Sequence, residues 1–97
     1  MIEHIVLFKV RADVPAADAE RMLEELRSLA KRVPVILELT CGTNISGRNQ
    51  GFTHALLVRF RSRTDLEAYI EHRDHQRVVA EQVRRITENI VVVDYEV

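Results

Sequence analysis

The first apolar run of the chain, IEHIVLFKV at residues 2–10, is apolar on both of its faces, and this constrains the fold more than any other feature. Its short length and its content of Ile, Val, Leu and Phe predict a strand. Because side chains alternate along a strand, one face carries Ile2, His4, Val6, Phe8 and Val10, and the other carries Glu3, Ile5, Leu7 and Lys9. A strand of this kind has to be covered on both sides.

The next elements follow from changes of periodicity. Residues 13–33 are apolar at helical spacing, which predicts an amphipathic helix with Pro15 in its first turn and Pro34 at its end. Strands are expected at 35–40 and 52–60. The loop between them is rich in Gly, Asn and Ser, so we expect the two strands to pair in antiparallel fashion.

A second helix is expected from about Asp65, because TDLE is a capping-box sequence in which Thr64 would cap the helix and Glu67 would reach back. The β-branched run at 90–97 predicts the last strand. The resulting order, β-α-β-β-α-β, is typical of an α+β, ferredoxin-like fold, with helices on one face of an antiparallel sheet. We expect one domain over residues 1–97.

The second face of this sheet predicts a partner. Ile5 and Leu7 would lie on that face together with Val91, Val93, Tyr95 and Val97 of the last strand. An exposed apolar patch of this size is larger than monomers usually tolerate. The sequence therefore predicts a homodimer formed sheet against sheet, with Tyr95 in the dimer core.

Composition argues against several classes of partner. The chain has 97 residues, 14 Lys and Arg against 15 Asp and Glu, and a net charge of -1, so neither nucleic acid nor membrane is expected as a partner. No segment has the pattern of a signal peptide, which predicts a cytoplasmic protein. Cys41 is the single cysteine and lacks CxxC spacing, so we expect a half-buried structural thiol.

The segment EAYIEHRDHQRV at 67–78 carries the most chemistry, because Tyr69, His72 and His75 follow one another at three-residue steps. A zinc site would need at least three protein ligands, and only the two histidines share a helix face, so no metal is expected. On one unbroken helix, Tyr69 and His75 would point about 240° apart. They can converge only at a break, which we expect between Ile70 and Asp74, with Asp74 capping the next helix and His72 facing outward.

The chain resembles the stress-responsive dimeric α/β-barrel (Dabb) family over essentially its whole length. The resemblance rests on EHIVLFKV, GTNIS, GFTHALLVRFRS, DLEAYIEHRDH and VVVDYEV, in this order and spacing. It implies two ferredoxin-like protomers that pair their sheets into a homodimeric α/β barrel, with the helices outside. The family usually has His-Pro-x-His where this chain has His72-Arg73-Asp74-His75.

One polyketide-cyclising member of the family closes a tetraketide thioester by an aldol condensation. The resemblance implies that Tyr69 and His75 match its catalytic pair and that His4 and His54 match its pocket histidines. That member has helix aromatics where this chain has aliphatic residues. The residues that we expect to line a substrate pocket are His4, His54, Val6, Phe8, Leu23, Leu26, Leu56 and Val78.

Three hypotheses about function follow. The first is a homodimer whose pocket, between sheet and helices, takes a small, largely apolar carbonyl compound, with His75 as base, Tyr69 as its partner and no cofactor. The second is a non-enzymatic, stress-associated or ligand-binding dimer whose histidines are structural. The third is a monooxygenase-like protein, either cofactor-independent or haem-related, which related dimeric barrels suggest.

Overall fold

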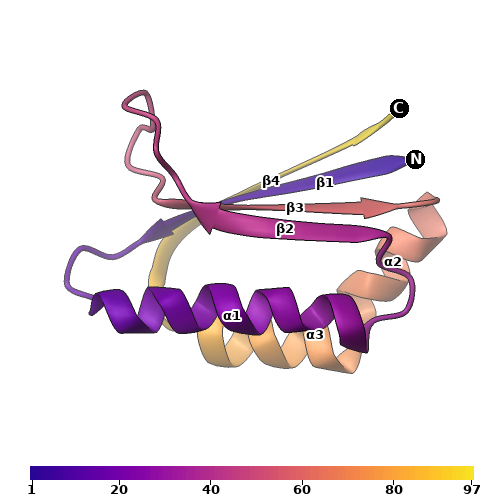
Figure 1. The fold of residues 1–97 in the computed structure, drawn as a ribbon, viewed down its shortest axis with the longest axis horizontal. Coiled ribbons are helices and arrows are strands. Elements are labelled where there is room, and N and C mark those ends of the chain that lie inside the picture. The colour runs from indigo at the N-terminus through magenta and orange to yellow at the C-terminus, as the bar shows by residue number, and fades with distance from the viewer.

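The computed structural model describes all 97 residues, and Figure 1 shows an antiparallel sheet above a layer of helices. The elements are β1 (Ile2–Val10), α1 (Ala16–Arg32), β2 (Glu38–Thr43), β3 (His54–Phe60), α2 (Arg63–Glu71), α3 (Arg73–Val78), the π-helical turn η1 (Val79–Val83) and β4 (Thr87–Glu96). The strand order is β2-β3-β1-β4, with every neighbouring pair antiparallel. The predicted ferredoxin-like α+β fold is confirmed. None of the helices is long and apolar enough to cross a membrane.

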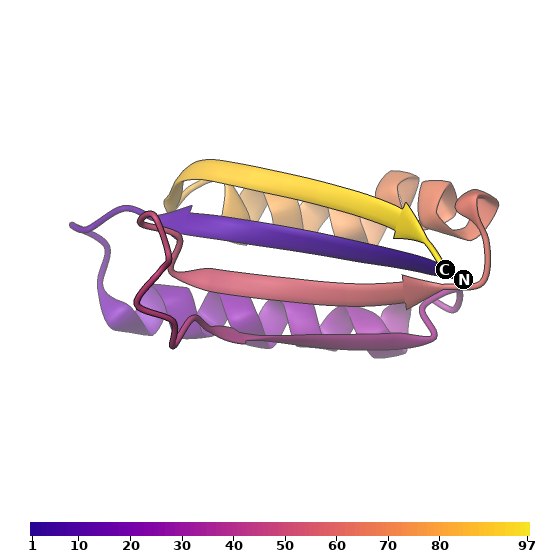
Figure 2. The ribbon, with the colours of Figure 1, turned by 90° about the horizontal axis from the view of Figure 1, so that it is seen from above.

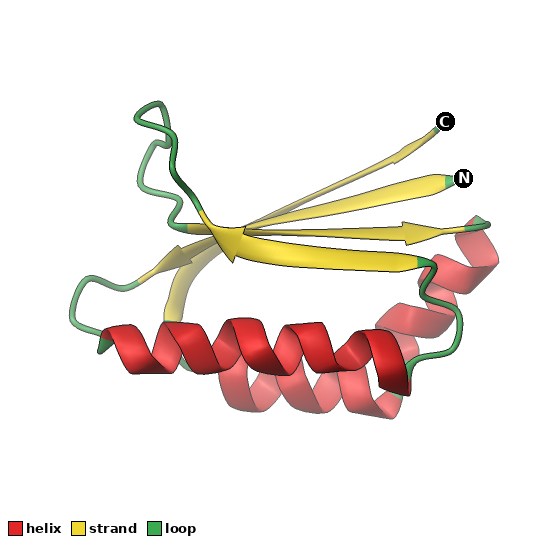
Figure 3. Cartoon of the chain, viewed as in Figure 1, coloured by secondary structure: helices red, strands yellow, loops and turns green.

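The core lies between the sheet and the helices, all of which cover the same face of the sheet (Figure 3). Alternate residues of β1 and β3 point into it, including Val6, Phe8, Val58 and Phe60. They pack against the apolar stripe of α1, which buries Met22, Leu23, Leu26 and Leu29. Burial of this apolar stripe is what holds α1 against the sheet.

The opposite face of the sheet has no covering layer, as the view from above in Figure 2 shows. On that face, Val93 and Tyr95 are 48% and 49% exposed, and Ile5, Leu7 and Leu57 are only half-buried. We call the residues Ile5, Leu7, Ala55, Leu57, Val91, Val93 and Tyr95 the outer patch. The two apolar faces expected of β1 are therefore present in the fold.

Several strand boundaries differ from those predicted. β2 begins at Glu38 instead of residue 35, because the chain turns after α1 and the amide of Ile36 donates to the carbonyl of Val33. Pairing with β3 starts only where the amide of Leu37 donates a hydrogen bond to the backbone carbonyl of Arg59. β3 starts two residues late, at His54, and β4 starts early, at Thr87. The β4 extension pairs with Val10 across an irregularity in register, which alternation alone does not predict.

The helix starts differ as well. Pro15 is the residue before α1 and not part of its first turn. α2 is capped by Ser62, whose hydroxyl accepts a hydrogen bond from the amide of Asp65 at 3.2 Å, so the prediction that Thr64 caps the helix was wrong. Ser62 has the extended backbone that an N-cap needs, whereas Thr64 already lies inside the helix.

Candidate active site

The predicted break in the second helical region is confirmed, and it falls at His72. This residue ends α2 and starts α3, with φ −62° and ψ 134°. Its Nδ1 accepts a hydrogen bond from the amide of Asp74 at 3.1 Å. The cap is therefore His72 itself and not Asp74, and His72 is half-buried at the bend, where an outward helix residue was expected.

The bend brings Tyr69 and His75 together. Their ring centroids are 4.2 Å apart, with an interplanar angle of 46°. Tyr69 is fully buried, and its hydroxyl has no hydrogen-bond partner, so the two residues touch through their rings and no hydrogen bond joins them. Nδ1 of His75 lies 3.1 Å from the carbonyl oxygen of Ile70. Because a carbonyl only accepts, Nδ1 carries the proton, and Nε2 is the free acceptor of the neutral ring.

Burial sets the protonation states of both groups. It lowers the pKa of His75, although the hydrogen bond to Ile70 partly opposes the shift. Burial also raises the pKa of Tyr69, and a negative charge on the Cys41 thiol would raise it further. At neutral pH the site therefore holds a neutral imidazole, which can accept a proton, beside a neutral phenol, which can donate a hydrogen bond.

A third polar group, His4, lies against the same tyrosine. Its ring packs edge-on to Tyr69 with centroids 5.7 Å apart, and its Nδ1 lies 2.5 Å from a carboxylate oxygen of Asp94. His4 and Asp94 are directly opposite each other in the β1–β4 register. Asp94 was not among the residues expected at the site. The signal was present, because Asp94 alternates with Val92 and Ile90 on the helix-facing side of β4.

Tyr69, His75 and His4 lie on the wall of a cavity of about 600 Å³ between the sheet and the α3–η1 segment. Its apolar lining is Val6, Phe8, Leu26, Leu56, Ile70, Val79, Val83, Ile90 and Val92. The exposed residues Arg84, Glu88 and Asn89 mark its mouth beside β4. None of the lining residues from η1 and β4 was expected from the sequence, because they approach the cavity only once the β4 strand is paired. A mostly apolar cavity with a few converging polar groups is the usual form of a small-molecule site.

Three of the residues expected in the pocket do not line this cavity. Leu23 and Val78 are buried in the core behind its wall. His54 lies further along β3, where its Nδ1 is 2.7 Å from the Thr53 hydroxyl, and burial lowers its pKa. The other expected lining residues, His4, Val6, Phe8, Leu26 and Leu56, do line it. What each of these residues does for a substrate stays a prediction.

Cys41 behaves as the sequence suggested. It is half-buried, its Sγ lies 3.6 Å from the carbonyl oxygen of Leu23, and burial raises the pKa of the thiol. No cluster of three or more His, Cys, Asp or Glu side chains could hold a metal ion.

The fold and the cavity together define a small ferredoxin-like domain that encloses a histidine- and tyrosine-lined site between its sheet and its helices. The chain belongs to the stress-responsive A/B barrel domain (Dabb) family, whose family model matches residues 2–97.

Curated relatives include two stress-response A/B barrel domain-containing proteins of Arabidopsis thaliana. The first is 38% identical over 95 residues, which are 98% of this chain and 36% of that relative. The second is 38% identical over 99 residues, which are 98% of this chain and 46% of that relative. The chain thus spans less than half the length of these two relatives. Olivetolic acid cyclase of Cannabis sativa is 23% identical over 96 residues, covering 97% of this chain and 94% of the cyclase.

Solved structures share the fold closely. The protein At3g17210 of Arabidopsis thaliana has a TM-score of 0.90 at 21% identity, covering 100% of this chain and 95% of its own. A dimeric protein of unknown function from Bacteroides fragilis has a TM-score of 0.81 at 28% identity, covering 99% and 95%. Hydroxynitrile lyase from Passiflora edulis has a TM-score of 0.89 at 23% identity, covering 99% and 92%. An antibiotic biosynthesis monooxygenase shares the fold at a TM-score of 0.74 and 15% identity, covering 100% and 98%.

Proposed function

We propose that the protein is a homodimer whose protomers each bind a small, largely apolar carbonyl compound in the cavity and act on it by acid/base chemistry. His75 is the base, Tyr69 is the hydrogen-bond donor to the carbonyl oxygen, and His4 orients the substrate or relays a proton. The non-enzymatic alternative is a dimer that binds the same class of compound without changing it.

The observation that carries this proposal is the hydroxyl of Tyr69, a residue of the cavity wall, because this hydroxyl is fully covered and has no hydrogen-bond partner. A buried donor left unsatisfied costs about 1–3 kcal/mol, so native proteins rarely keep one without a reason. A carbonyl oxygen of a ligand would satisfy it once the side chains that cover the hydroxyl move aside. The cavity volume, about 600 Å³, suits a small molecule of drug size or below.

The chemistry follows from the protonation states of the two side chains. Nε2 of His75 takes a proton from the carbon next to the carbonyl, and the electron pair of the broken C–H bond moves to the carbonyl oxygen as an enolate. The Tyr69 hydroxyl donates a hydrogen bond to that oxygen, where negative charge develops. The enolate carbon can then attack a second carbonyl of the same molecule, and the new alkoxide recovers the proton from His75. Atoms and charge balance without a cofactor.

The relatives favour this class of reaction. A curated relative that aligns over nearly its whole length is a cyclase, named for olivetolic acid. On α1 only Leu26 reaches the cavity wall of this chain, and Leu23 lies behind it. Because the resemblance implies helix aromatics at the matching positions of the cyclase, the compound bound here is expected to differ from the cyclase's substrate.

The dimer part of the proposal rests on the outer patch. Val93 and Tyr95 are each about half exposed in the protomer. The neighbouring β1 residues Ile5 and Leu7 extend the same apolar surface. A structure of the same fold at 28% identity is described as dimeric. A second copy laid against this face would cover the patch, as sheet packing in sandwiches does.

We would test the ligand site by NMR of the four histidine side chains, with 3-oxooctanoyl N-acetylcysteamine thioester as probe. The expected result is saturable shifts at His75 and His4, with His54, which lies outside the cavity, as the unchanged internal reference. Equal shifts at all four histidines, or none at His75, would remove the proposed site. Shifts without chemical change of the probe would favour the non-enzymatic alternative.

A matched pair of variants controls this titration. Val92→Trp fills the cavity mouth at a position that is 52% exposed, so the fold should tolerate it, and the shifts should be lost. Ile45→Trp adds the same ring to a fully exposed loop position and should leave the shifts unchanged.

A further inference from the structure

We infer that the cavity selects a carbonyl compound with a carboxylate at its far end, and that Arg84 and Asn89 at the mouth bind this carboxylate. The inference rests on the proposed function, because it names the class of compound that the same site takes. Three properties of the mouth support it: the donors that are free there, the turn that places Arg84, and the distance from the mouth to the reacting groups.

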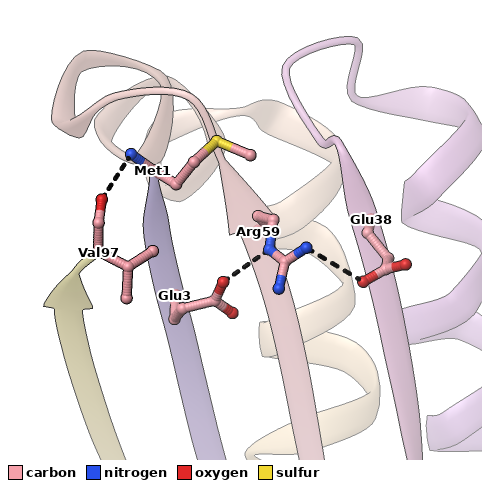
Figure 4. A network of polar contacts seen from close by, with 5 residues as sticks. All are labelled: Met1, Glu3, Glu38, Arg59 and Val97. Carbon is pink, nitrogen blue, oxygen red and sulfur yellow. Dashed lines mark hydrogen bonds and ion pairs between the residues drawn. The ribbon is translucent and has the colours of Figure 1, made fainter.

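Arg84 is the only arginine or lysine on the wall of the cavity. The arginines that form ion pairs are others: Arg11, Arg59, Arg63 and Arg77. Figure 4 shows the contrast, because the Arg59 guanidinium is already engaged by two carboxylates, 2.6 Å from Glu3 and 4.0 Å from Glu38. The guanidinium of Arg84 has no such partner, and its planar fork of donors matches a carboxylate of a ligand.

Asn89 supplies a second donor at the mouth. Its Oδ1 accepts a hydrogen bond from the amide of Ile90 at 2.9 Å, so Nδ2 is the half of the side chain that is left to donate to a ligand. The third polar residue of the mouth, Glu88, is exposed and brings a negative charge. One guanidinium and one amide beside an acid suit a group with a single negative charge, so a carboxylate fits better than a phosphate.

The π-helical turn η1 is what brings Arg84 to the cavity. In an α-helix of about 3.6 residues per turn, Arg84 would lie about 140° around the axis from Val79. In η1 the amide of Arg84 donates a hydrogen bond of 2.9 Å to the carbonyl of Val79, five positions back, so the turn is wider and both residues line the cavity. Turns of this kind are rare and occur frequently at functional sites.

The mouth lies at the end of the cavity opposite to the reacting groups. In the register of β1 and β4, His4 lies opposite Asp94, whereas Phe8 lies opposite Ile90, the neighbour of Asn89. His4 and Phe8 both line the cavity and are four positions apart on β1, which corresponds to about 13 Å.

This separation sets the length of the ligand. An unbranched chain of roughly ten bonds, each about 1.5 Å long, spans about 13 Å in zigzag form. The wall between the two ends is mostly apolar, which suits a hydrocarbon chain. A keto acid with about ten bonds between its ketone oxygen and its carboxylate oxygen therefore reaches Tyr69 and Arg84 together.

We would measure the binding of 9-oxodecanoic acid and of its methyl ester at neutral pH, by NMR of the His75 side chain. The two probes share the ketone and the chain length and differ in charge. We expect the wild type to bind the acid about tenfold more tightly than the ester. A shorter keto acid, 4-oxopentanoic acid, cannot reach both ends, so its binding should not depend on Arg84.

Three variants assign the preference to the mouth. Arg84→Gln removes the cation at an exposed position, and the acid should then bind no better than the ester. Glu88→Gln removes the neighbouring negative charge and should tighten binding of the acid about threefold without changing that of the ester. Arg85→Gln is the matched control and should keep the preference, because Arg85 does not line the cavity and its Nε donates to the carbonyl of Glu81.

The outcomes separate this inference from the proposed function. Equal affinities of acid and ester in the wild type, with saturable shifts at His75, would overturn the carboxylate site and leave the ligand cavity standing. Loss of the preference in Arg85→Gln as complete as in Arg84→Gln would also overturn it, because general surface charge would then explain the effect. If neither the two probes nor the thioester shifts His75, the proposed function itself is refuted.

Discussion

At the scale of single residues, the Tyr69 hydroxyl is the least satisfied group in the protein. The rings of His4, Phe60 and His75 pack around the tyrosine, with centroids 4.2 to 5.7 Å away, yet none of them gives the hydroxyl a hydrogen bond. The aromatic contacts fix the ring, while the donor stays free. The ring is thus held in place, and a ligand needs only a local movement of the covering side chains to reach the hydroxyl.

Removing this hydroxyl should therefore not harm the fold. For Tyr69→Phe we expect a free energy of unfolding that is unchanged or raised by up to about 1 kcal/mol, because the variant no longer buries an unsatisfied donor. Urea denaturation measures this, with Tyr95→Phe on the outer face as the reference. A loss above about 1 kcal/mol would mean that the hydroxyl has a partner in the folded protein.

The buried histidines make a prediction about pH. The pKa values of His75 and His54 in the folded protein lie below the unfolded value of about 6.5. Between the folded and unfolded values the unfolded chain binds more protons, so stability falls as the pH drops through about 6.5 and is fully present above it. Urea midpoints measured from neutral to mildly acidic pH should show this fall. The double variant His54→Gln, His75→Gln should flatten it, and an equally steep fall in that variant would refute the assignment.

Individual site residues were predictable to different degrees. Tyr69 and His75 could be found because both lie on one short segment and a single bend decides whether they meet. Alternation along the last strand could place Asp94 on the helix-facing side, but not beside His4, because that contact depends on the register between two strands whose paired residues are 90 positions apart. The same dependence explains the misplacement of His54, which shares a sheet face with His4 but lies at its far end, where Phe8 is its cross-strand neighbour.

At the scale of elements, the bend at His72 positions the site. The local sequence has no proline there, but His72 already has the extended ψ that a residue before proline adopts, and its side chain caps the helix that follows. A break was predictable because Tyr69 and His75 can meet only if the helix is interrupted between them. The capping residue was not, because a histidine is an unusual N-cap and its Nδ1 becomes an acceptor only in the appropriate tautomer.

This geometry makes a prediction for Arg73→Pro. Arg73 is the first residue of α3, where the amide has no partner within the helix and proline is well tolerated. We expect the free energy of unfolding to stay unchanged or to rise by about 0.4–1 kcal/mol, because proline restricts the unfolded chain. In the helix interior, Arg77→Pro should cost about 3 kcal/mol or more. Thermal and urea unfolding of the two variants provides the comparison, and a clear loss in Arg73→Pro would contradict the bend as described.

At the scale of the whole molecule, the sheet separates two different surfaces. Its helix-facing side carries the cavity, and its other side carries the outer patch. The alternation along β1 predicted this division from the sequence, because no single helix layer could cover both faces. The length of β4 was underestimated, since Thr87 to Asn89 are polar and join the strand only by pairing with the end of β1.

Charge placed on the outer patch should separate the copies without unfolding them. For Ile5→Asp we expect sedimentation at the monomer mass of 11.2 kDa, with the circular dichroism of a folded chain, because a carboxylate cannot be buried unpaired between two sheets. Ile45→Asp, at a fully exposed loop position, should remain dimeric. An Ile5→Asp variant that stays dimeric would place the interface elsewhere on the molecule.

The most direct test of the central claim is hydrogen–deuterium exchange at the carbon next to a carbonyl. In D2O, the wild-type protein should speed exchange of these protons in the 3-oxooctanoyl thioester above the uncatalysed rate. His75→Gln should reduce the acceleration by about a hundredfold, since the general base is lost. Tyr69→Phe should reduce it as well, while the thioester still binds. If His75→Gln exchanges the protons as fast as the wild type does, His75 is not the base, and the acid/base function proposed for the cavity is wrong.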